Sequence, residues 1–396
     1  MDSIRRISAS YVYTSESDSP LRNAFVEYDS STGRILKVGL CGEGEPVENV
    51  ALVPGFVNAH CHCELSHLLG KFRKGTGMAG FIDQINELRD WAGNDVKTRL
   101  VQEWMDKMWA DGVSAMADIS NDSSSFSVKA GHKMYTRTFL EVFGTEPDQC
   151  DGVMAGVAEL AEEASAFGID AAPTPHSCYT MSPQLLAKSS KAGLESGFLS
   201  YHSQESQEEE DMIRYGSGAM YENRKRAGMS TPKVTGGSSL EYFINVLRKN
   251  SLLPTSSNIL LVHNVCISQE DIDMAVNAFE NVYFALCPLS NIFIHNALPP
   301  VELLVSNGLN ITIGTDSLSS NDDLDMIAEI ACIKENFPSV SMAEIFKWAT
   351  ISGARFLGKD DLLGSISVGK CPGLVIVDGI DADGNVTGHS HSKRLI

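Results

Sequence analysis

Short apolar runs alternate with amphipathic helical patterns through the middle of the sequence, and this alternation limits the choice of fold more than any other feature. Eight runs rich in apolar and β-branched residues end near His62, Asp118, Leu140, His176, His202, His263, Cys287 and Asp316. Stripes with the i, i+3, i+4 spacing of a helix lie between many of these runs, for example over residues 101–109. Eight strand–helix units predict a (β/α)8 TIM barrel, an α/β fold, over residues 54–358.

The two ends of the chain follow another pattern, in which strand-like runs occur without a strongly periodic helix. Alternation over residues 7–13 and 24–28 indicates strands near the start, and residues 374–378 indicate one near the end. Strand-rich ends that flank a different middle favour one small domain built from both of them. We expect residues 1–53 and 359–396 to form a composite β-sandwich.

Composition excludes several classes of function. The formal net charge of -20 argues against a nucleic-acid partner, because phosphate binding needs a basic patch. No apolar run reaches the roughly 18 residues of a membrane span, and residues 1–6 lack the apolar core that would follow in a secretory signal. Nine scattered cysteines, an odd number, favour free thiols over disulfides. We therefore expect a cytoplasmic protein that acts on a small molecule, and a homo-oligomer remains open.

The stretch Val-Pro-Gly-Phe-Val-Asn-Ala-His-Cys-His at residues 53–62 ends in two histidines spaced two apart. Side chains on a strand alternate between faces, so His60 and His62 would share one face and Cys61 and Cys63 the other. Two imidazoles at the end of a strand can bind one metal ion. The alternative is a polar strand end without a metal.

Donors at other strand ends favour the metal. Chemistry in such barrels lies at the carboxyl ends of the strands, so His202 and Asp316 can join the histidine pair in an N3O set with an open position for water. Zinc or iron suits this set. Taken singly, His202 or His263 could be a hydrogen-bonded structural histidine, and Asp316 could cap a helix. Because all of these residues occur at strand ends, a shared metal site is favoured over these separate structural roles.

These motifs resemble the amidohydrolase superfamily. The similarity is greatest to the branch that contains cytosine deaminases, chlorohydrolases and adenosine-type deaminases, including aminofutalosine-deaminase-like members. It extends over nearly the whole chain, including both ends. The motifs that carry it are Pro54-Gly-Phe-Val-Asn-Ala-His60-Cys-His62, His202-Ser-Gln-Glu205, His263-Asn264 and Gly314-Thr-Asp316-Ser.

The resemblance implies specific roles for these residues. The expected ligands of one divalent ion, with Zn2+ preferred to Fe2+, are His60, His62, His202 and Asp316. Glu205 would shuttle protons, His263 would hydrogen-bond the attacking water or the substrate, and Asp316 would also accept the proton of the water. Deamination of an amidine-like carbon needs hydroxide at carbon and a proton on the adjacent ring nitrogen, which a carboxylate near a ligand can deliver.

A single metal ion is expected, because the fourth run ends Ala172-Pro-Thr-Pro-His176 without the lysine that dinuclear relatives carry there. His176 resembles a substrate-contacting histidine of the family, and a loop histidine is its alternative. Glu64 lies in a stretch similar to one in aminofutalosine-deaminase-like members, as a substrate contact or a salt-bridged loop acid. Arg137 could bind a polar or anionic substrate tail, or pair with Glu141 or another acid. Residues 71–80, rich in glycine, are interpreted as a mobile loop over the pocket.

The prediction that follows is a metal-dependent hydrolase of non-peptide carbon–nitrogen bonds. The preferred reaction is deamination of a purine- or pyrimidine-like heterocycle or nucleoside, with release of ammonia. The alternative enzyme opens a cyclic amide or imidazolone ring with the same groups. A non-catalytic scaffold is disfavoured, because such proteins tend to lose ligands and this sequence keeps the full set.

Overall fold

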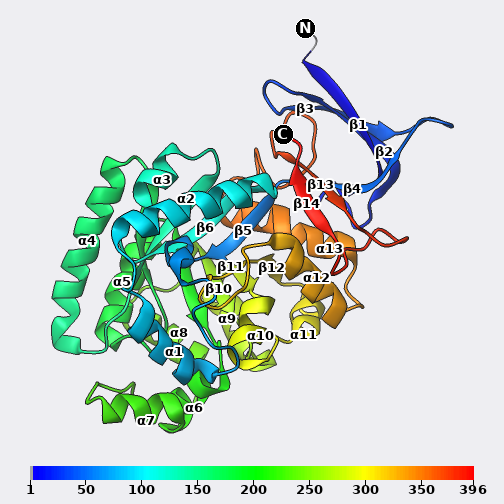
Figure 1. The fold of residues 1–396 in the computed structure, drawn as a ribbon. Helices are drawn as coiled ribbons and strands as arrows, with labels where there is room; N and C mark the ends of the chain where they lie inside the picture. The colour runs from blue at the N-terminus through cyan, green and yellow to red at the C-terminus, as the bar shows by residue number, and fades with distance from the viewer. Residues whose placement is uncertain (1–2) are drawn as a thin grey trace.

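Strands from both ends of the chain pair in one six-stranded sheet, shown in Figure 1 in blue and red. A computed structural model describes residues 3–396; residues 1 and 2, at the start of the expected 1–53 segment, lie outside the described residues. The order is β14-β13-β4-β1-β2-β3. The bounds are β1 (Ile4–Val12), β2 (Leu21–Asp29), β3 (Ile35–Leu40), β4 (Glu48–Pro54), β13 (Leu374–Asp378) and β14 (His391–Arg394). Within residues 3–396 these strands form one sheet and not the two facing sheets of a sandwich.

The middle of the chain forms eight parallel strands in two sheets of four, each in chain order. The first sheet contains β5 (Phe56–Cys61), β6 (Val113–Ser120), β7 (Tyr135–Val142) and β8 (Asp170–Pro175). The second contains β9 (Phe198–Ser203), β10 (Thr255–His263), β11 (Phe279–Leu286) and β12 (Asn310–Ile313). The predicted alternation of strands and helices is confirmed. The strands read as near-continuous apolar runs because both faces are covered.

The two parallel sheets meet at two seams, and both seams lie at the site. At one of them the backbone N–H of His202 donates to the carbonyl of His176 at 2.9 Å. At the other, Asp316 N–H donates to the carbonyl of His60 at 3.0 Å, and Cys61 and Asp316 form an isolated parallel bridge. The strand ladders do not run continuously across these seams. Gly314 permits the second contact, since a Cβ there would lie 2.7 Å from the backbone of His60.

Helices surround the strands in Figure 1. Their bounds are α1 (Gly77–Leu88), α2 (Asn94–Ala110), α3 (Phe126–Gly131), α4 (Cys150–Ala166), α5 (Pro183–Glu195), α6 (Gln207–Tyr215), α7 (Ala219–Arg226), α8 (Ser239–Lys249), α9 (Gln269–Ala278), α10 (Pro288–His295), α11 (Val301–Ser306), α12 (Met326–Asn336), α13 (Met342–Lys347) and α14 (Gly353–Phe356). Shorter turns are η1 (Cys63–Leu68), η2 (Pro147–Gln149) and η3 (Trp348–Ser352). None of the helices formed by residues 3–396 combines the length and apolarity needed to cross a membrane.

Local sequence explains where several of these helices start. Serine side chains at positions 182, 206, 238, 268 and 341 accept a hydrogen bond from the first turn of α5, α6, α8, α9 and α13. The predicted stripe of α2 is buried at Val101, Met105 and Met108. Residues 77–80, expected in a loop, instead form the first turn of α1.

Candidate metal centre and active-site pocket

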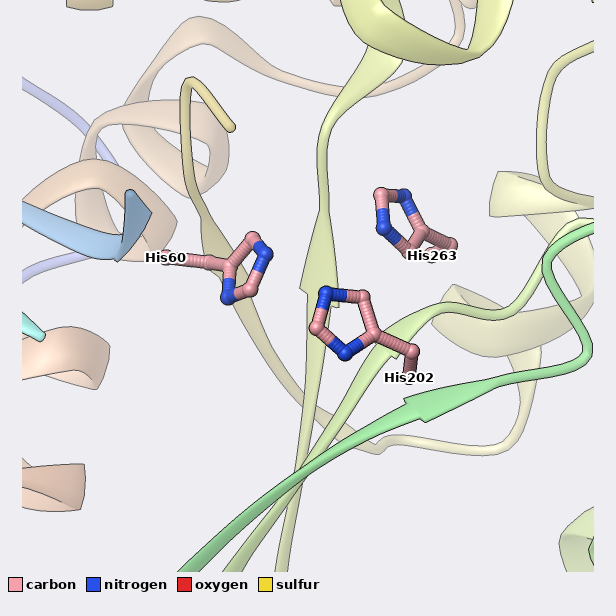
Figure 2. A group of neighbouring side chains, drawn as sticks. All are labelled: His60, His202 and His263. Carbon is pink, nitrogen blue, oxygen red and sulfur yellow. The ribbon is translucent and has the colours of Figure 1, made fainter. Parts of the chain in front are cut away.

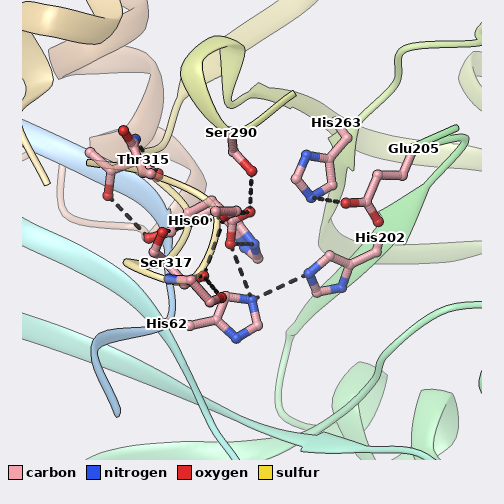
Figure 3. A network of polar contacts seen from close by, with 12 residues as sticks. His60, His62, His202, Glu205, His263, Ser290, Thr315 and Ser317 are labelled. Carbon is pink, nitrogen blue, oxygen red and sulfur yellow. Dashed lines mark hydrogen bonds and ion pairs between the residues drawn. The ribbon is translucent and has the colours of Figure 1, made fainter. Parts of the chain in front are cut away.

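Three of the expected donors lie together where β5 and β12 end. His60 Nε2 and His62 Nε2 lie 3.8 Å and 3.7 Å from Asp316 Oδ1 (Figure 3). Asp316 adopts a left-handed backbone with φ 57°. Ser290 Oγ and Ser320 Oγ donate to its other oxygen, Oδ2, at 2.5 Å and 2.8 Å. Oδ1 therefore remains directed at the two histidines.

His202 brings a third imidazole to this cluster from β9. Its Nε2 lies 3.3 Å from His62 Nε2, and Figure 2 shows its ring beside those of His60 and His263. The opposite nitrogen, Nδ1, lies 3.3 Å from the carbonyl oxygen of His176 and 3.4 Å from Glu141 Oε1. Two acceptors on that side favour a proton on Nδ1. The lone pair of Nε2 is then free to bind a metal ion.

The donor set fits a divalent metal ion. The Nε2 of His60, which faces Asp316, is buried without a hydrogen-bond partner, a costly arrangement unless an ion satisfies it. Burial holds the pKa of His60 well below its usual value and lowers that of His62 to about 4. Burial opposes ionisation of Asp316, but the neighbouring His62 and His263 keep its pKa below the ordinary value. Neutral imidazoles and a carboxylate are the forms that bind metal.

Glu205, two residues beyond the end of β9, and His263, the last residue of β10, lie next to this cluster. Glu205 Oε1 is 3.4 Å from His263 Nε2, and its Oε2 accepts a hydrogen bond from the Tyr179 hydroxyl at 3.0 Å. On the other side of the His263 ring, Asn291 Nδ2 lies 3.1 Å from Nδ1. Burial raises the pKa of Glu205 well above its usual value, and the charge of Asp316 raises it further. Glu205 therefore favours its protonated form, and a protonated carboxyl can act as an acid.

A cavity opens over these groups and is lined by both apolar and polar residues. The apolar lining consists of Leu65, Met78, Phe81, Ile82, Ile85 and Phe143. The polar lining consists of Asn86, Arg89, Asn121, Glu141, His176, Tyr179, Thr180, Ser317 and Ser319, together with His62, His202, Glu205, His263 and Asp316. Ligand sites typically combine such an apolar lining with a few convergent polar groups.

The structure brings one of the three expected substrate contacts into this cavity. His176 lines it and stacks on His202 with ring centroids 4.4 Å apart. Glu64 is buried in η1 and does not line it. Its Oε2 accepts the backbone N–H of Asn121 at 2.7 Å, and its Oε1 lies 3.9 Å from Arg89 Nη2. Burial raises the pKa of Glu64 to about 7.

Arg137 is not brought to the cavity. It is the third residue of β7 and lies near the amino end of the strand, away from the carboxyl ends that carry the site. Its guanidinium pairs with Asp170 and donates to Ser196 Oγ at 2.7 Å. The structure therefore contradicts the expected contact between Arg137 and a substrate tail. It agrees with the alternative, in which Arg137 pairs with another acid.

The sequence assigned no role to two polar residues that line the cavity: Tyr179, three positions after His176, and Arg89, which follows α1. Arg89 Nη2 donates to Asn121 Oδ1 at 2.8 Å, and its guanidinium lies 5.3 Å from the ring centroid of Phe143. A signal for Arg89 was present: residues 78, 81, 82, 85 and 89 repeat with helical spacing and share one face.

Comparison with known proteins agrees with this geometry. The model of the amidohydrolase family matches residues 51–394. The chain is 26% identical over 408 aligned residues to a 5-methylthioadenosine/S-adenosylhomocysteine deaminase of Natronomonas pharaonis, and the match covers 95% of this chain and 84% of that protein.

Two solved structures share the fold. The aminofutalosine deaminase of Helicobacter pylori in complex with methylthio-coformycin aligns with a TM-score of 0.75 at 21% identity, covering 95% and 93% of the two chains. An adenosine deaminase from Xanthomonas campestris with bound zinc aligns with a TM-score of 0.72 at 23% identity, covering 94% and 84%. These likenesses support a TIM-barrel α/β fold. Because the family model spans most of its length, this chain belongs to the amidohydrolase family and is a hydrolytic enzyme.

Proposed function

We propose that this enzyme deaminates an amino-substituted purine nucleoside and releases ammonia. The observation that carries the proposal is the convergence of three imidazoles and one carboxylate beside the Glu205–His263 pair, at the floor of a single cavity. The curated relative described above is named a deaminase of 5-methylthioadenosine and S-adenosylhomocysteine, which supports the same reaction class.

The residues proposed to hold the ion are His60, His62, His202 and Asp316. Zinc is the preferred ion, and iron(II) also suits these donors. When bound, a divalent ion supplies hydroxide near neutral pH by lowering the pKa of a water ligand.

The proposed proton transfers use three side chains. Asp316 accepts a proton from the attacking water, and His263 hydrogen-bonds the incoming oxygen through Nε2. Protonated Glu205 gives its proton to the ring nitrogen next to the carbon under attack. The proton held on Asp316 then passes to the amino group, and the carbon–nitrogen bond breaks with the electron pair leaving on ammonia. The remaining hydroxyl proton returns to Glu205 as the carbonyl forms. One water is consumed, and the ring carbon gains a carbonyl oxygen in place of the amine.

The cavity walls suggest how the rest of the nucleoside binds. The face of α1 that carries Met78, Phe81 and Ile82 suits an apolar substituent such as a thioether. Arg89, beside Asn121, suits a polar or anionic end of a longer substituent. Glu64 is proposed to act through Arg89, since it lies 3.9 Å from that guanidinium.

Two broader expectations accompany this proposal. The division into residues 54–358, with the catalytic groups, and residues 1–53 with 359–396 is supported by the sheet shared by the two ends. A cytoplasmic location is supported by nine cysteines that are all free thiols.

A substrate panel tests the function directly. Enzyme loaded with zinc is assayed for ammonia release from adenosine, 5′-methylthioadenosine, S-adenosylhomocysteine, adenine and cytosine, and for ring opening of dihydrouracil. We expect ammonia and a 6-oxopurine product from at least one nucleoside. Ring opening without ammonia release would establish the alternative hydrolase. No turnover of any compound by fully metal-loaded enzyme would overturn the proposal.

A further inference from the structure

The chain turns sharply between β9 and Glu205, and a buried carboxylate holds that turn. Gln204, the intervening residue, has a left-handed backbone with φ 48°. Glu209 Oε1 accepts the backbone N–H of Gln204 at 3.2 Å, and its Oε2 accepts that of Glu205 at 2.8 Å. Glu209 is fully buried in the first turn of α6. The proposed mechanism gives this side chain no chemical task.

We propose that Glu209 is a positioning residue, which fixes the backbone of Glu205 so that its side chain points at His263 and the substrate. The inference rests on the proposed function, because it assumes that Glu205 transfers the proton. A left-handed conformation in a non-glycine residue persists when the surroundings over-determine it. Burial raises the pKa of Glu209 to about 7. In its ionised form the carboxylate accepts two strong hydrogen bonds, one at each oxygen, which can hold this conformation.

A second connection ties Glu205 to the neighbouring loop. The Tyr179 hydroxyl donates to Glu205 Oε2 at 3.0 Å, and the adjacent Cys178 Sγ contacts Glu209 Oε1 at 3.4 Å. The loops that follow β8 and β9 are therefore joined at two points. With its backbone held by Glu209 and Oε2 held by Tyr179, Glu205 has only Oε1 free to face His263, 3.4 Å away.

The substitution Glu209→Gln separates this role from packing, because it changes neither size nor shape. A carboxylate accepts two N–H groups, whereas a primary amide presents one acceptor and one donor. The amide would therefore leave one of the two backbone N–H groups without a partner. Glu210→Gln is the matched control. Glu210 is also buried and accepts from the Ser239 hydroxyl at 2.7 Å, the Arg214 Nε at 2.7 Å and the Gln204 side-chain amide at 3.2 Å, but it does not contact either backbone N–H. The Gln204 side chain keeps a second acceptor, Asp271 Oδ2 at 2.9 Å.

Activity of the metal-loaded variants provides the first readout. We expect E209Q to lower kcat by about 10- to 100-fold with little change in KM or metal content, since small misplacements of a catalytic group have effects of that size. The pH dependence of kcat should shift in E209Q, because the environment of the Glu205 proton changes. E210Q should keep kcat and the pH profile close to wild type even if its melting temperature falls.

Hydrogen exchange provides a readout that does not depend on turnover. The backbone amides of Gln204 and Glu205 should be protected in wild type and in E210Q, and at least one of them should exchange faster in E209Q. If E209Q does not fold, E209D is measured in the same way, and its shortened carboxylate should give a partial loss.

The outcomes distinguish failure of the proposed function from failure of the positioning role of Glu209. Absence of turnover in wild type counts against the proposed function, whereas unchanged kcat and amide protection in an active E209Q would overturn the positioning role. A loss of kcat that only follows the loss of stability, equal in E209Q and E210Q, would also overturn it.

Discussion

His263 Nε2 lies 3.4 Å from Glu205 Oε1, and both side chains are buried beside the cluster of His60, His62, His202 and Asp316. His263 Nδ1 faces the Asn291 amide at 3.1 Å, and an amide donor there places the proton of a neutral imidazole on Nε2. Burial also lowers the pKa of His263 to about 4. A neutral, oriented imidazole beside a protonated carboxyl is an arrangement suited to proton transfer at neutral pH.

The substitution Glu205→Gln should remove the proton transfer and preserve the shape of the site. We expect kcat to fall by about 10²- to 10⁴-fold, the usual contribution of a general acid–base group. Ammonia release and metal content are measured on the same sample, and the metal content should equal that of wild type. Glu270→Gln, on the exposed first turn of α9, is the control and should retain full activity. A Glu205→Gln enzyme with normal kcat would assign the proton transfer to another group.

Replacing Tyr179 by phenylalanine should shift the pH dependence of the reaction in a defined direction. The hydroxyl donates to Glu205 Oε2 at 3.0 Å, and this hydrogen bond favours the charged carboxylate and so lowers its pKa. Its removal should raise the pKa of Glu205 further. Because activity needs the protonated carboxyl, the fall in rate at alkaline pH should move to higher pH in Tyr179→Phe. The profile of kcat against pH measures this shift, and movement to lower pH would contradict the assignment.

The sequence allowed prediction of those site residues whose positions follow from a single rule of strand geometry. Histidines spaced two apart on a strand share a face, and residues at the carboxyl ends of parallel strands converge, so the cluster of His60, His62, His202 and Asp316 could be anticipated. The structure brings these four together. The structure also places His176, at the end of another apolar run, beside His202.

Residues whose role depends on long-range packing could not be assigned in this way. An apolar run does not show which residue a charged side chain within it will contact. The pairing of Arg137 with Asp170 on the next strand could therefore not be predicted. The position of α1 depends on contacts with distant elements such as α6, where the Glu208 carboxylate accepts the Met78 N–H at 2.9 Å. Arg89 directly follows α1, so its place in the cavity depends on such contacts as well.

The substitution Arg89→Met should change substrate preference more than catalysis. Arg89 provides the only guanidinium that lines the cavity within the described residues, and methionine keeps much of its length without the charge. A charged hydrogen bond contributes about 1.5–3 kcal/mol, so KM for a substrate whose tail ends in a carboxylate should rise roughly 10- to 100-fold. KM for 5′-methylthioadenosine should change little. Equal effects on both substrates would indicate that Arg89 acts only through the packing of Asn121 and Phe143.

The substitution Lys129→Met should destabilise the fold, because it leaves a buried charge without a partner. Lys129 Nζ lies 2.5 Å from Asp118 Oδ2, and both side chains are fully buried. The other oxygen of Asp118 accepts the Cys63 N–H at 2.8 Å, next to the proposed metal ligand His62. Removing one member of such a pair typically costs about 3–5 kcal/mol.

Denaturant unfolding of metal-free protein measures this cost without a contribution from metal binding. Lys191→Met is the control, since Lys191 pairs with Glu195 at 3.8 Å on the exposed face of α5, and such surface pairs contribute no more than about 1 kcal/mol. The double variant Lys129→Met/Asp118→Asn should recover part of the loss, because it removes the uncompensated charge. If Lys129→Met were no less stable than Lys191→Met, Asp118 would have to be neutral in the folded protein, and the turn that carries Cys63 would be held by an uncharged carboxyl.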